Sequence, residues 1–192
     1  MTTDLKTRLA EIQNRLNGLR PVAEVSADTQ LFISSDAVCR RLMAVAEPLS
    51  SDTFLEPSAG TGAILRAVLD AAPGISCEAV EMHIALARQL ATAFPAVPVH
   101  NQDFLHWSPE TRYSLIVMNP PFRNGADIRH IRHAQSLLAP GGRLVAVCAA
   151  GSRQQRDLLP DAVHSERLPR GAFAYTDVAT MIVRIDGPEC PN

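Results

Sequence analysis

Short apolar runs alternate with amphipathic segments along most of the chain, and this alternation predicts its secondary structure. Apolar positions at helical spacing predict helices over 36–46, 63–72, 83–94, 127–138 and 153–159. Apolar runs of strand length end at Glu56 and cover 76–82, 97–100, 115–118, 143–149, 164–168 and 179–185. Strands separated by helices pair in parallel, so the pattern predicts an α/β fold with a doubly wound seven-stranded sheet, mostly parallel with an antiparallel last strand.

The first thirty residues carry a different pattern from the rest of the chain. Leucine and isoleucine recur at spacings of four and three between positions 5 and 19, and Pro21 ends this helical seam. Two heptads are too few to be stable alone, so the seam would pack on the domain, on a second copy or on a recognition subunit. We therefore expect a helix and connector over 1–29, one main domain over 30–186 and a tail over 187–192.

A glycine turn follows the first predicted strand. Glu56 ends the strand, Pro57 cannot continue it, and Gly60 and Gly62 permit a tight turn and close approach of a ligand before the next helix. Such a turn directs backbone N–H groups at a nucleotide-like ligand. The third glycine of a dinucleotide fingerprint is replaced by Leu65, and no Gly-Lys-Ser/Thr follows, so a structural turn remains an alternative for this stretch by itself.

Two further acids lie at predicted strand ends. Glu81 follows Gly62 by 19 residues, close to the spacing at which a carboxylate accepts hydrogen bonds from a ribose diol. Asp103 follows the third strand, where it could contact a ligand or cap a turn. Both acids would therefore lie at the same sheet edge as the glycine turn.

The fourth predicted strand ends in the sequence Asn119-Pro120-Pro121-Phe122. The two prolines remove two backbone donors and stiffen the turn. The Asn119 side chain and the Pro120 carbonyl are left as acceptors beside an aromatic ring. Further along, the Pro-Gly-Gly sequence at 140–142 is predicted to form a loop that separates the fourth helix from the next strand.

Composition narrows the class of protein. The chain of 192 residues is 46% hydrophobic and 20% charged, which suits one globular domain. Its four cysteines are far apart, no cluster has metal-ligand spacing, and no apolar run is long enough to span a membrane. We therefore expect a cytoplasmic protein without a metal site or a membrane partner.

The net charge of −2 gives no general argument for nucleic acid, but the arginines are unevenly distributed. Six arginines and one acid, Asp127, lie between positions 123 and 156, a local net charge of +5. Such a run could form a solvated face or a phosphate-binding face, and its place in the fold decides between them.

Taken in order, these segments resemble class I S-adenosylmethionine-dependent methyltransferases, which have a Rossmann-like sheet, and among them the DNA adenine-N6 enzymes. Four motifs carry the resemblance: EPSAGTG at 56–62, Glu81, Asp103 with Phe104, and NPPF at 119–122. Two softer matches, QLFISS at 30–35 and the stretch 168–185, extend it over roughly residues 30–185. The resemblance implies S-adenosyl-L-methionine as cofactor and methylation of an exocyclic amino nitrogen, with adenine N6 in DNA favoured.

The resemblance also assigns roles to residues. Cofactor binding is implied for Phe32, Ser34, Glu56, Pro57, Ala59, Gly60, Gly62, Glu81, Met82, Asp103, Phe104 and Asn119. The catalytic turn is Asn119, Pro120, Pro121 and Phe122, where the amide and carbonyl oxygens would hold the target amine and the ring would stack on the flipped base. Arg123, Arg129 and Arg132 follow this turn and are expected to contact nucleic-acid phosphates.

Several alternatives stay open. Similar turns occur in enzymes that methylate guanine N2 or adenine N6 in RNA and glutamine amides in proteins, because these groups share a planar, weakly nucleophilic nitrogen. Only about twenty residues separate Phe122 from the next predicted strand, so the chain lacks the long recognition insertion usual in the DNA enzymes. A cofactor-binding but non-catalytic subunit of a larger modification complex is therefore a further possibility.

Overall fold

The structure is a computed structural model that describes residues 34–173 and 178–189. All of them belong to the second of the two units into which the chain divides, Phe32–Asn192. The predictions for the N-terminal helix, its possible role in dimer formation and Phe32 lie outside the described residues.

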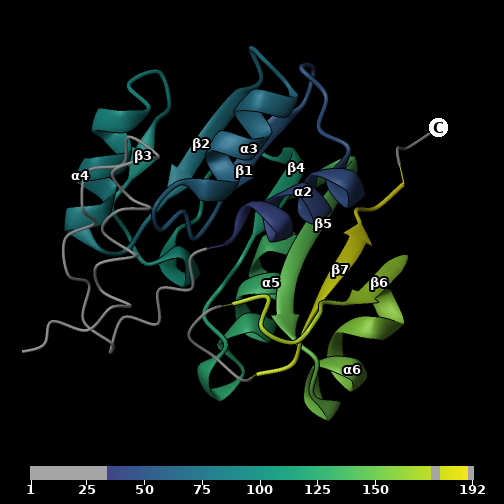
Figure 1. Cartoon of the computed structure of the whole chain (residues 1–192). Coiled ribbons are helices and arrows are strands. Elements are labelled where there is room, and N and C mark those ends of the chain that lie inside the picture. Colours follow the sequence, from purple (N-terminus) through teal and green to yellow (C-terminus); the bar gives the residue numbers. More distant parts are fainter. Residues whose placement is uncertain (1–33, 174–177, 190–192) are drawn as a thin grey trace, which may run out of the picture. The chain divides into compact units, whose positions relative to one another are not determined.

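Seven strands form one sheet (Figure 1): β1 (Thr53–Glu56), β2 (Ser76–Val80), β3 (Val99–His100), β4 (Tyr113–Met118), β5 (Leu138–Ala149), β6 (His164–Arg167) and β7 (Thr180–Asp186). Their order is β3-β2-β1-β4-β5-β7-β6. The first five pair in parallel, and β7 is antiparallel to both β5 and β6. This arrangement confirms the predicted doubly wound seven-stranded sheet.

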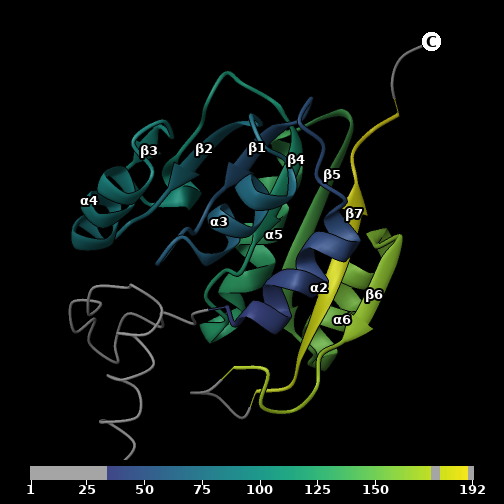
Figure 2. The same cartoon turned by 45° about the horizontal axis from the view of Figure 1, so that its top comes forward.

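Helices cover both faces of the sheet because each helix has one apolar stripe. They are α2 (Asp36–Ala46), α3 (Ala63–Ala71), α4 (Ile84–Ala93), α5 (Ala126–Ser136) and α6 (Ser152–Leu158), with 3-10 turns at η2 (Phe104–His106), η3 (Arg123–Gly125) and η4 (Leu159–Asp161). Residues of α2 and α3 belong to one buried cluster, and residues of α5 and α6 to the other. Figure 2 shows these two pairs of helices on opposite sides of the sheet.

The start of β5 differs from the prediction. The strand begins at Leu138 rather than at position 143, and the Pro-Gly-Gly segment forms an irregularity within it, opposite Tyr113 and Leu115 of β4. The Gly141 N–H donates to Pro188 O (2.8 Å), and the Gly187 N–H donates to Gly142 O (2.7 Å). The segment after β7 thus satisfies backbone groups that the sequence pattern assigned to a loop.

Arg143 stabilises the edge of the sheet opposite to the predicted site. Its Nη2 lies 2.7 Å from Asp52 Oδ2, and its guanidinium also donates to Ala46 O and Glu47 O at the end of α2. Burial alone would raise the pKa of Asp52, but the hydrogen bonds from Arg143, Ser114 and the Leu49 N–H outweigh it and hold that pKa below its usual value. Arg143 therefore binds within the protein and is not part of a phosphate-binding face.

Candidate active site

The predicted site residues lie in the segments that leave the carboxyl ends of neighbouring parallel strands. Strand β1 pairs with β2 on one side and with β4 on the other, with Glu56 opposite Ala79 and Leu55 opposite Ile116. This pairing brings the segments after Glu56, Val80 and Met118 to one edge of the sheet. Ligands of open α/β sheets bind at this edge, where loops and helix amino termini meet.

The glycine turn between β1 and α3 has the backbone that its sequence predicted. Gly60 and Gly62 have φ angles of 54° and 78°, values that side-chain-bearing residues rarely adopt. A Cβ atom on Gly62 would lie 2.7 Å from Phe94 Cε2 and 2.8 Å from Leu90 Cδ2. The turn is therefore sharply bent and packed closely against α4. Helix α3 begins directly after it, so the first backbone N–H groups of α3 lie at the edge of the sheet that carries the site.

Glu56 is fully buried beneath this turn. Burial raises its pKa well above the usual range, the nearby Glu81 carboxylate raises it further, and a hydrogen bond from the Leu65 N–H offsets only part of the shift. Within the described residues, its Oε2 has no hydrogen-bond partner. A buried carboxyl oxygen without a partner is costly, and its presence beside a glycine turn indicates a ligand-binding site.

Glu81 joins the glycine turn to the end of β2. Its Oε2 accepts a hydrogen bond from the Gly60 N–H (2.8 Å), and its Oε1 accepts one from the His83 N–H (2.7 Å). Each carboxylate oxygen can accept a second hydrogen bond, so the group can still bind two hydroxyls. Asn101, which the sequence reasoning did not select, donates from Nδ2 to the carbonyls of Glu81 and Met82, each at 2.9 Å, and fixes this backbone.

The cofactor-binding residues predicted after β2 and β3 present different groups to a ligand. Met82 is 60% exposed and offers an apolar surface next to Glu81. Asp103 caps η2: its Oδ1 accepts from the Leu105 N–H (3.0 Å), and its Oδ2 lies 3.1 Å from His106 Nδ1. Phe104 is buried, with its ring 4.7 Å from the His133 ring between centroids, so its side chain packs in the core and only its backbone can face a ligand.

Asn119, directly after β4, is held by the segment that precedes α2. Its Nδ2 donates a hydrogen bond to Oγ of the buried Ser34 over 3.2 Å. Because the amide nitrogen faces Ser34, the amide presents its oxygen Oδ1 on the other side. Ser34 was selected by resemblance as a cofactor residue, and the structure adds this contact with Asn119.

The remaining residues of the predicted catalytic turn are held close to the core. Pro120 is buried and Pro121 half-buried, while Phe122 is largely buried, with its ring edge-to-face on Phe173 at a centroid distance of 6.3 Å. Phe173 lies between β6 and β7, within the stretch 168–185 that extends the resemblance, but the sequence reasoning did not select this ring. The contact links that segment to the turn after β4.

The three arginines predicted to contact phosphates make different contacts. Arg123 is exposed and directly follows the Phe122 ring. Arg129 donates from Nη1 to Asn124 O (3.2 Å), at the entrance to its own helix. Arg132 donates to Asp161, to the Asp157 carbonyl and to Gln135, and so ties α5 to α6 and η4. The Arg132 guanidinium is therefore used within the protein.

A buried carboxylate supports the helix that follows the catalytic turn. Asp127 is completely buried in the first turn of α5, and its Oδ2 accepts from the Ala149 N–H (3.0 Å) and from Gln154 Nε2 (2.9 Å). These bonds connect α5 to the carboxyl end of β5 and to α6. Neither the burial of Asp127 nor its partner Gln154 was recognisable from the sequence, which showed only an acid among arginines.

Comparisons with known proteins agree with this geometry. The sheet order, the antiparallel β7 and the glycine turn after β1 define the fold of S-adenosylmethionine-dependent methyltransferases. Residues 29–169 match the methyltransferase small domain family, and the chain belongs to that family. A comparison with curated protein sequences gave no match.

Three solved structures illustrate the similarity. A modification subunit assigned to a type I restriction enzyme of Vibrio vulnificus YJ016 has 18% identity and a TM-score of 0.69, over 96% of this chain and 48% of that one. TrmN from Thermus thermophilus has 21% identity and a TM-score of 0.61, over 78% and 48%. The N-methyltransferase NodS from Bradyrhizobium japonicum WM9, crystallised with S-adenosyl-L-homocysteine, has 16% identity and a TM-score of 0.65, over 88% and 94%. The chain spans about half the length of the first two.

The residues at the site edge fit the cofactor of this fold, S-adenosyl-L-methionine. The positive φ angles of Gly60 and Gly62 bend the chain sharply into α3, Glu56 has an unsatisfied buried oxygen among the described residues, and Glu81 has acceptor capacity for a diol. Within residues 34–173 and 178–189, no group of three His, Cys, Asp or Glu side chains could hold a metal ion. In the same part of the chain, no helix has the length and apolar character that crossing a membrane requires.

Proposed function

We propose that the protein transfers a methyl group from S-adenosyl-L-methionine to an exocyclic amino nitrogen, with adenine N6 in DNA as the favoured target. The observation that carries the proposal is the Asn119 amide at the end of β4, which is oriented by its hydrogen bond to Ser34. Such an amide, followed by a proline carbonyl and an aromatic ring, provides two acceptors and a stacking surface for a planar amine.

The chemical difficulty is the low nucleophilicity of such an amine, because its lone pair is delocalised into the ring. The bound cofactor supplies an electrophilic methyl group on a positively charged sulfur. Asn119 Oδ1 and the Pro120 carbonyl would accept the two amine N–H bonds, which localises the lone pair and aims it at the methyl carbon. The new N–C bond forms as the C–S bond breaks and its electrons return to sulfur. The nitrogen then loses its excess proton to solvent.

The cofactor half of the site would be formed by the first two strand ends. Glu81 would accept hydrogen bonds from the ribose hydroxyls, while Met82, Asp103 and the Phe104 backbone would surround the adenine. Glu56 and the turn through Pro57, Ala59, Gly60 and Gly62 would hold the amino-acid end. Phe122 would stack on the target base after the base leaves its helix, and its ring now contacts Phe173 edge-to-face.

The short polypeptide connection between Phe122 and β5 limits how the protein can recognise its substrate. Only η3 and α5 lie between the catalytic turn and β5, so this connection contains no separate recognition element. Sequence-specific recognition would then depend on other segments or on a partner chain. This observation also keeps a second candidate function, a cofactor-binding subunit without its own catalysis.

Transfer of radiolabelled methyl groups to unmethylated DNA, total RNA and total protein, assayed in parallel, tests the proposal. Asn119→Ala is expected to lower kcat by about 100- to 1000-fold, the loss typical for removing one oriented transition-state contact. The exposed Arg112→Ala, at the opposite sheet edge, serves as the control for general damage. Label in RNA or protein but not in DNA would contradict the DNA assignment. Cofactor binding without transfer to any polymer would favour the non-catalytic subunit.

A further inference from the structure

The end of β6 and the turn that follows it carry two exposed arginines. Arg167 ends β6 and pairs in register with Met181, which also pairs with Cys148 near the carboxyl end of β5. Since β5 and β6 both run antiparallel to β7, Arg167 lies at the sheet edge where β5 ends. Arg170 follows three residues later, in the segment that leads to Phe173.

This segment is anchored to the core while its arginines face solvent. The Leu168 N–H donates to Thr180 O (2.9 Å), Leu168 and Ala172 pack against the buried cluster on the α2 side, and Phe173 contacts Phe122. Residues 169–172 form a turn in which the Ala172 N–H donates to Pro169 O (3.2 Å). Gly171 has a φ of 77°, the value expected at the third position of a type II turn, so Arg170 occupies its tip.

The charges around these two arginines leave them available for an anion. Among the described residues, neither the Arg167 nor the Arg170 side chain has a hydrogen bond or an ion pair. The one acid in β6, Glu166, is held by Arg41 of α2, with Arg41 Nε 2.9 Å from Glu166 Oε1. His164 Nε2 lies 3.7 Å from the other oxygen of the same carboxylate. The acid of β6 is thus already bound.

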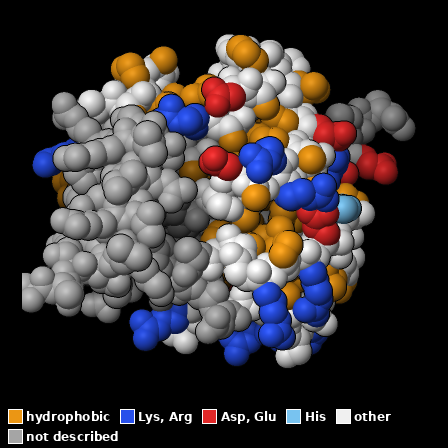
Figure 3. Space-filling view, in the orientation of Figure 1, with side chains coloured by type: hydrophobic (Ala, Val, Ile, Leu, Met, Phe, Trp, Pro, Cys, Tyr) orange, Lys and Arg blue, Asp and Glu red, His pale blue; other side chains and the backbone are white. Residues whose placement is uncertain are grey.

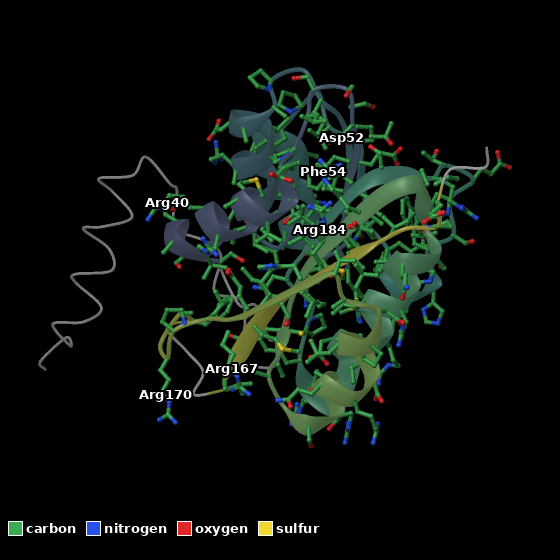
Figure 4. The ribbon with its side chains drawn as sticks, turned by 90° about the vertical axis from the view of Figure 1, so that its right-hand side faces the viewer. Arg40, Asp52, Phe54, Arg167, Arg170 and Arg184 are labelled. Carbon is green, nitrogen blue, oxygen red and sulfur yellow. The ribbon has the colours of Figure 1, made fainter. Side chains whose placement is uncertain are left out.

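The surface views agree with this distribution. In Figure 3, the lower part of the described face shows blue cationic side chains without red acidic ones. Figure 4 shows Arg167 and Arg170 on the side of the molecule away from Asp52, with the Arg170 side chain extending outward from its loop.

We propose that Arg167 and Arg170 bind consecutive phosphates of the nucleic-acid strand that carries the target base. This inference rests on the proposed function. It places the nucleic-acid strand next to Arg167 and Arg170 instead of along α5, where the sequence predicts phosphate contacts. Phosphate contacts come from the β6–β7 segment, coupled to Phe122 through Phe173, and Arg132 of α5 has a structural role. Arginine suits phosphate because its planar guanidinium donates two parallel hydrogen bonds.

The test compares the double variant Arg167→Ala/Arg170→Ala with Arg88→Ala/Arg112→Ala, which removes the same charge from exposed positions on α4 and before β4. Binding of labelled single- and double-stranded oligonucleotides is measured by fluorescence anisotropy between about 50 and 200 mM salt. The first variant is expected to weaken binding by about tenfold. It should reduce the salt slope by about 1.8 for the duplex and about 1.4 for the single strand, since each phosphate contact contributes about 0.9 or 0.7. The control variant is expected to match the wild type.

Two further measurements distinguish failure of this inference from failure of the proposed function. Binding of S-adenosyl-L-homocysteine should be the same in all variants, and KM for the polynucleotide should rise with kcat unchanged. Equal affinity and salt slope in both double variants would overturn the inference, even if the wild type methylates DNA or RNA. A wild type that binds no polynucleotide but methylates protein would overturn the inference together with the proposed function.

Discussion

The amide of Asn119 at the end of β4 is held by the hydroxyl of Ser34, 85 positions earlier in the chain, through a 3.2 Å hydrogen bond. Ser34→Ala should therefore lower kcat by about 5- to 30-fold, because losing a buried hydrogen bond costs about 1–2 kcal/mol and releases the amide to rotate. The KM for the cofactor and the polymer, measured by steady-state kinetics, should change less than kcat. Ser34→Thr, which keeps the hydroxyl, is the control. Equal kcat in Ser34→Ala and the wild type would contradict this positioning role.

Glu56 should make the stability of the protein depend on pH in the direction opposite to most carboxylates. Its pKa is raised in the folded state, so the folded protein binds more protons than the unfolded chain above the ordinary glutamate pKa. Its contribution to stability is complete at low pH and is lost as the pH rises toward the folded-state pKa. Glu56→Gln should therefore gain stability relative to the wild type as the pH rises from about 4 to 8, measured by thermal unfolding. If the difference in thermal stability between the two proteins stayed constant over this pH range, Glu56 would not have a raised pKa in the folded state.

Gly62 allows a comparison with a matched glycine. Gly62→Ala should cost about 1–3 kcal/mol and weaken S-adenosyl-L-homocysteine binding, because φ is 78° and the added Cβ would meet Phe94 and Leu90. Gly74→Ala has a similar φ of 82° but no atom within 4 Å of its added Cβ, so it should lose about 1–2 kcal/mol without affecting binding. Calorimetric titration and thermal unfolding separate the two effects. Comparable losses of binding in both variants would show that the close packing of Gly62 against Phe94 and Leu90 is unimportant for ligand binding.

Arg143 should be more important for stability than for activity. Arg143→Met keeps much of the side-chain volume but leaves Asp52, 6% exposed, without its cation, at a cost of about 3 kcal/mol. For a chain of this length that lowers Tm by about 6–12 °C. The pairing with Arg143 holds the pKa of Asp52 low. The difference in Tm between the wild type and Arg143→Met should therefore shrink as the pH falls and the carboxyl is protonated. Arg156→Met, which breaks the exposed pair with Asp157, should leave Tm nearly unchanged because solvent screens this pair.

The parts that could be predicted from sequence are those in which the local pattern determines the structure. The apolar run of β4 is buried along nearly its whole length, and the glycines after β1 have the positive φ angles that their residue type permits. The boundaries of α2 and α3 followed from their apolar faces and stops. The clustering of Glu56, Glu81 and Asn119 followed from the rule that parallel strands present their carboxyl ends at one edge.

What the sequence could not predict depends on distant partners. The Pro-Gly-Gly segment is part of β5 because residues after β7 bond to it, and these lie more than forty positions away. Arg132 and Arg143 look like Arg129 in sequence, yet each binds a carboxylate from another element. Phe104 packs among histidine and tryptophan rings instead of facing a ligand. Tertiary packing therefore determines which charged and aromatic side chains remain available to bind a ligand.

The central claim is tested most directly by the identity of the methylated product. Unmethylated DNA incubated with the protein and labelled S-adenosyl-L-methionine is digested to nucleosides, which are analysed by mass spectrometry. The account predicts that the label is found in N6-methyldeoxyadenosine and that it is lost with Asn119→Ala. Label on a ring carbon, or equal transfer by wild type and Asn119→Ala, would contradict methylation of an exocyclic amine held by Asn119.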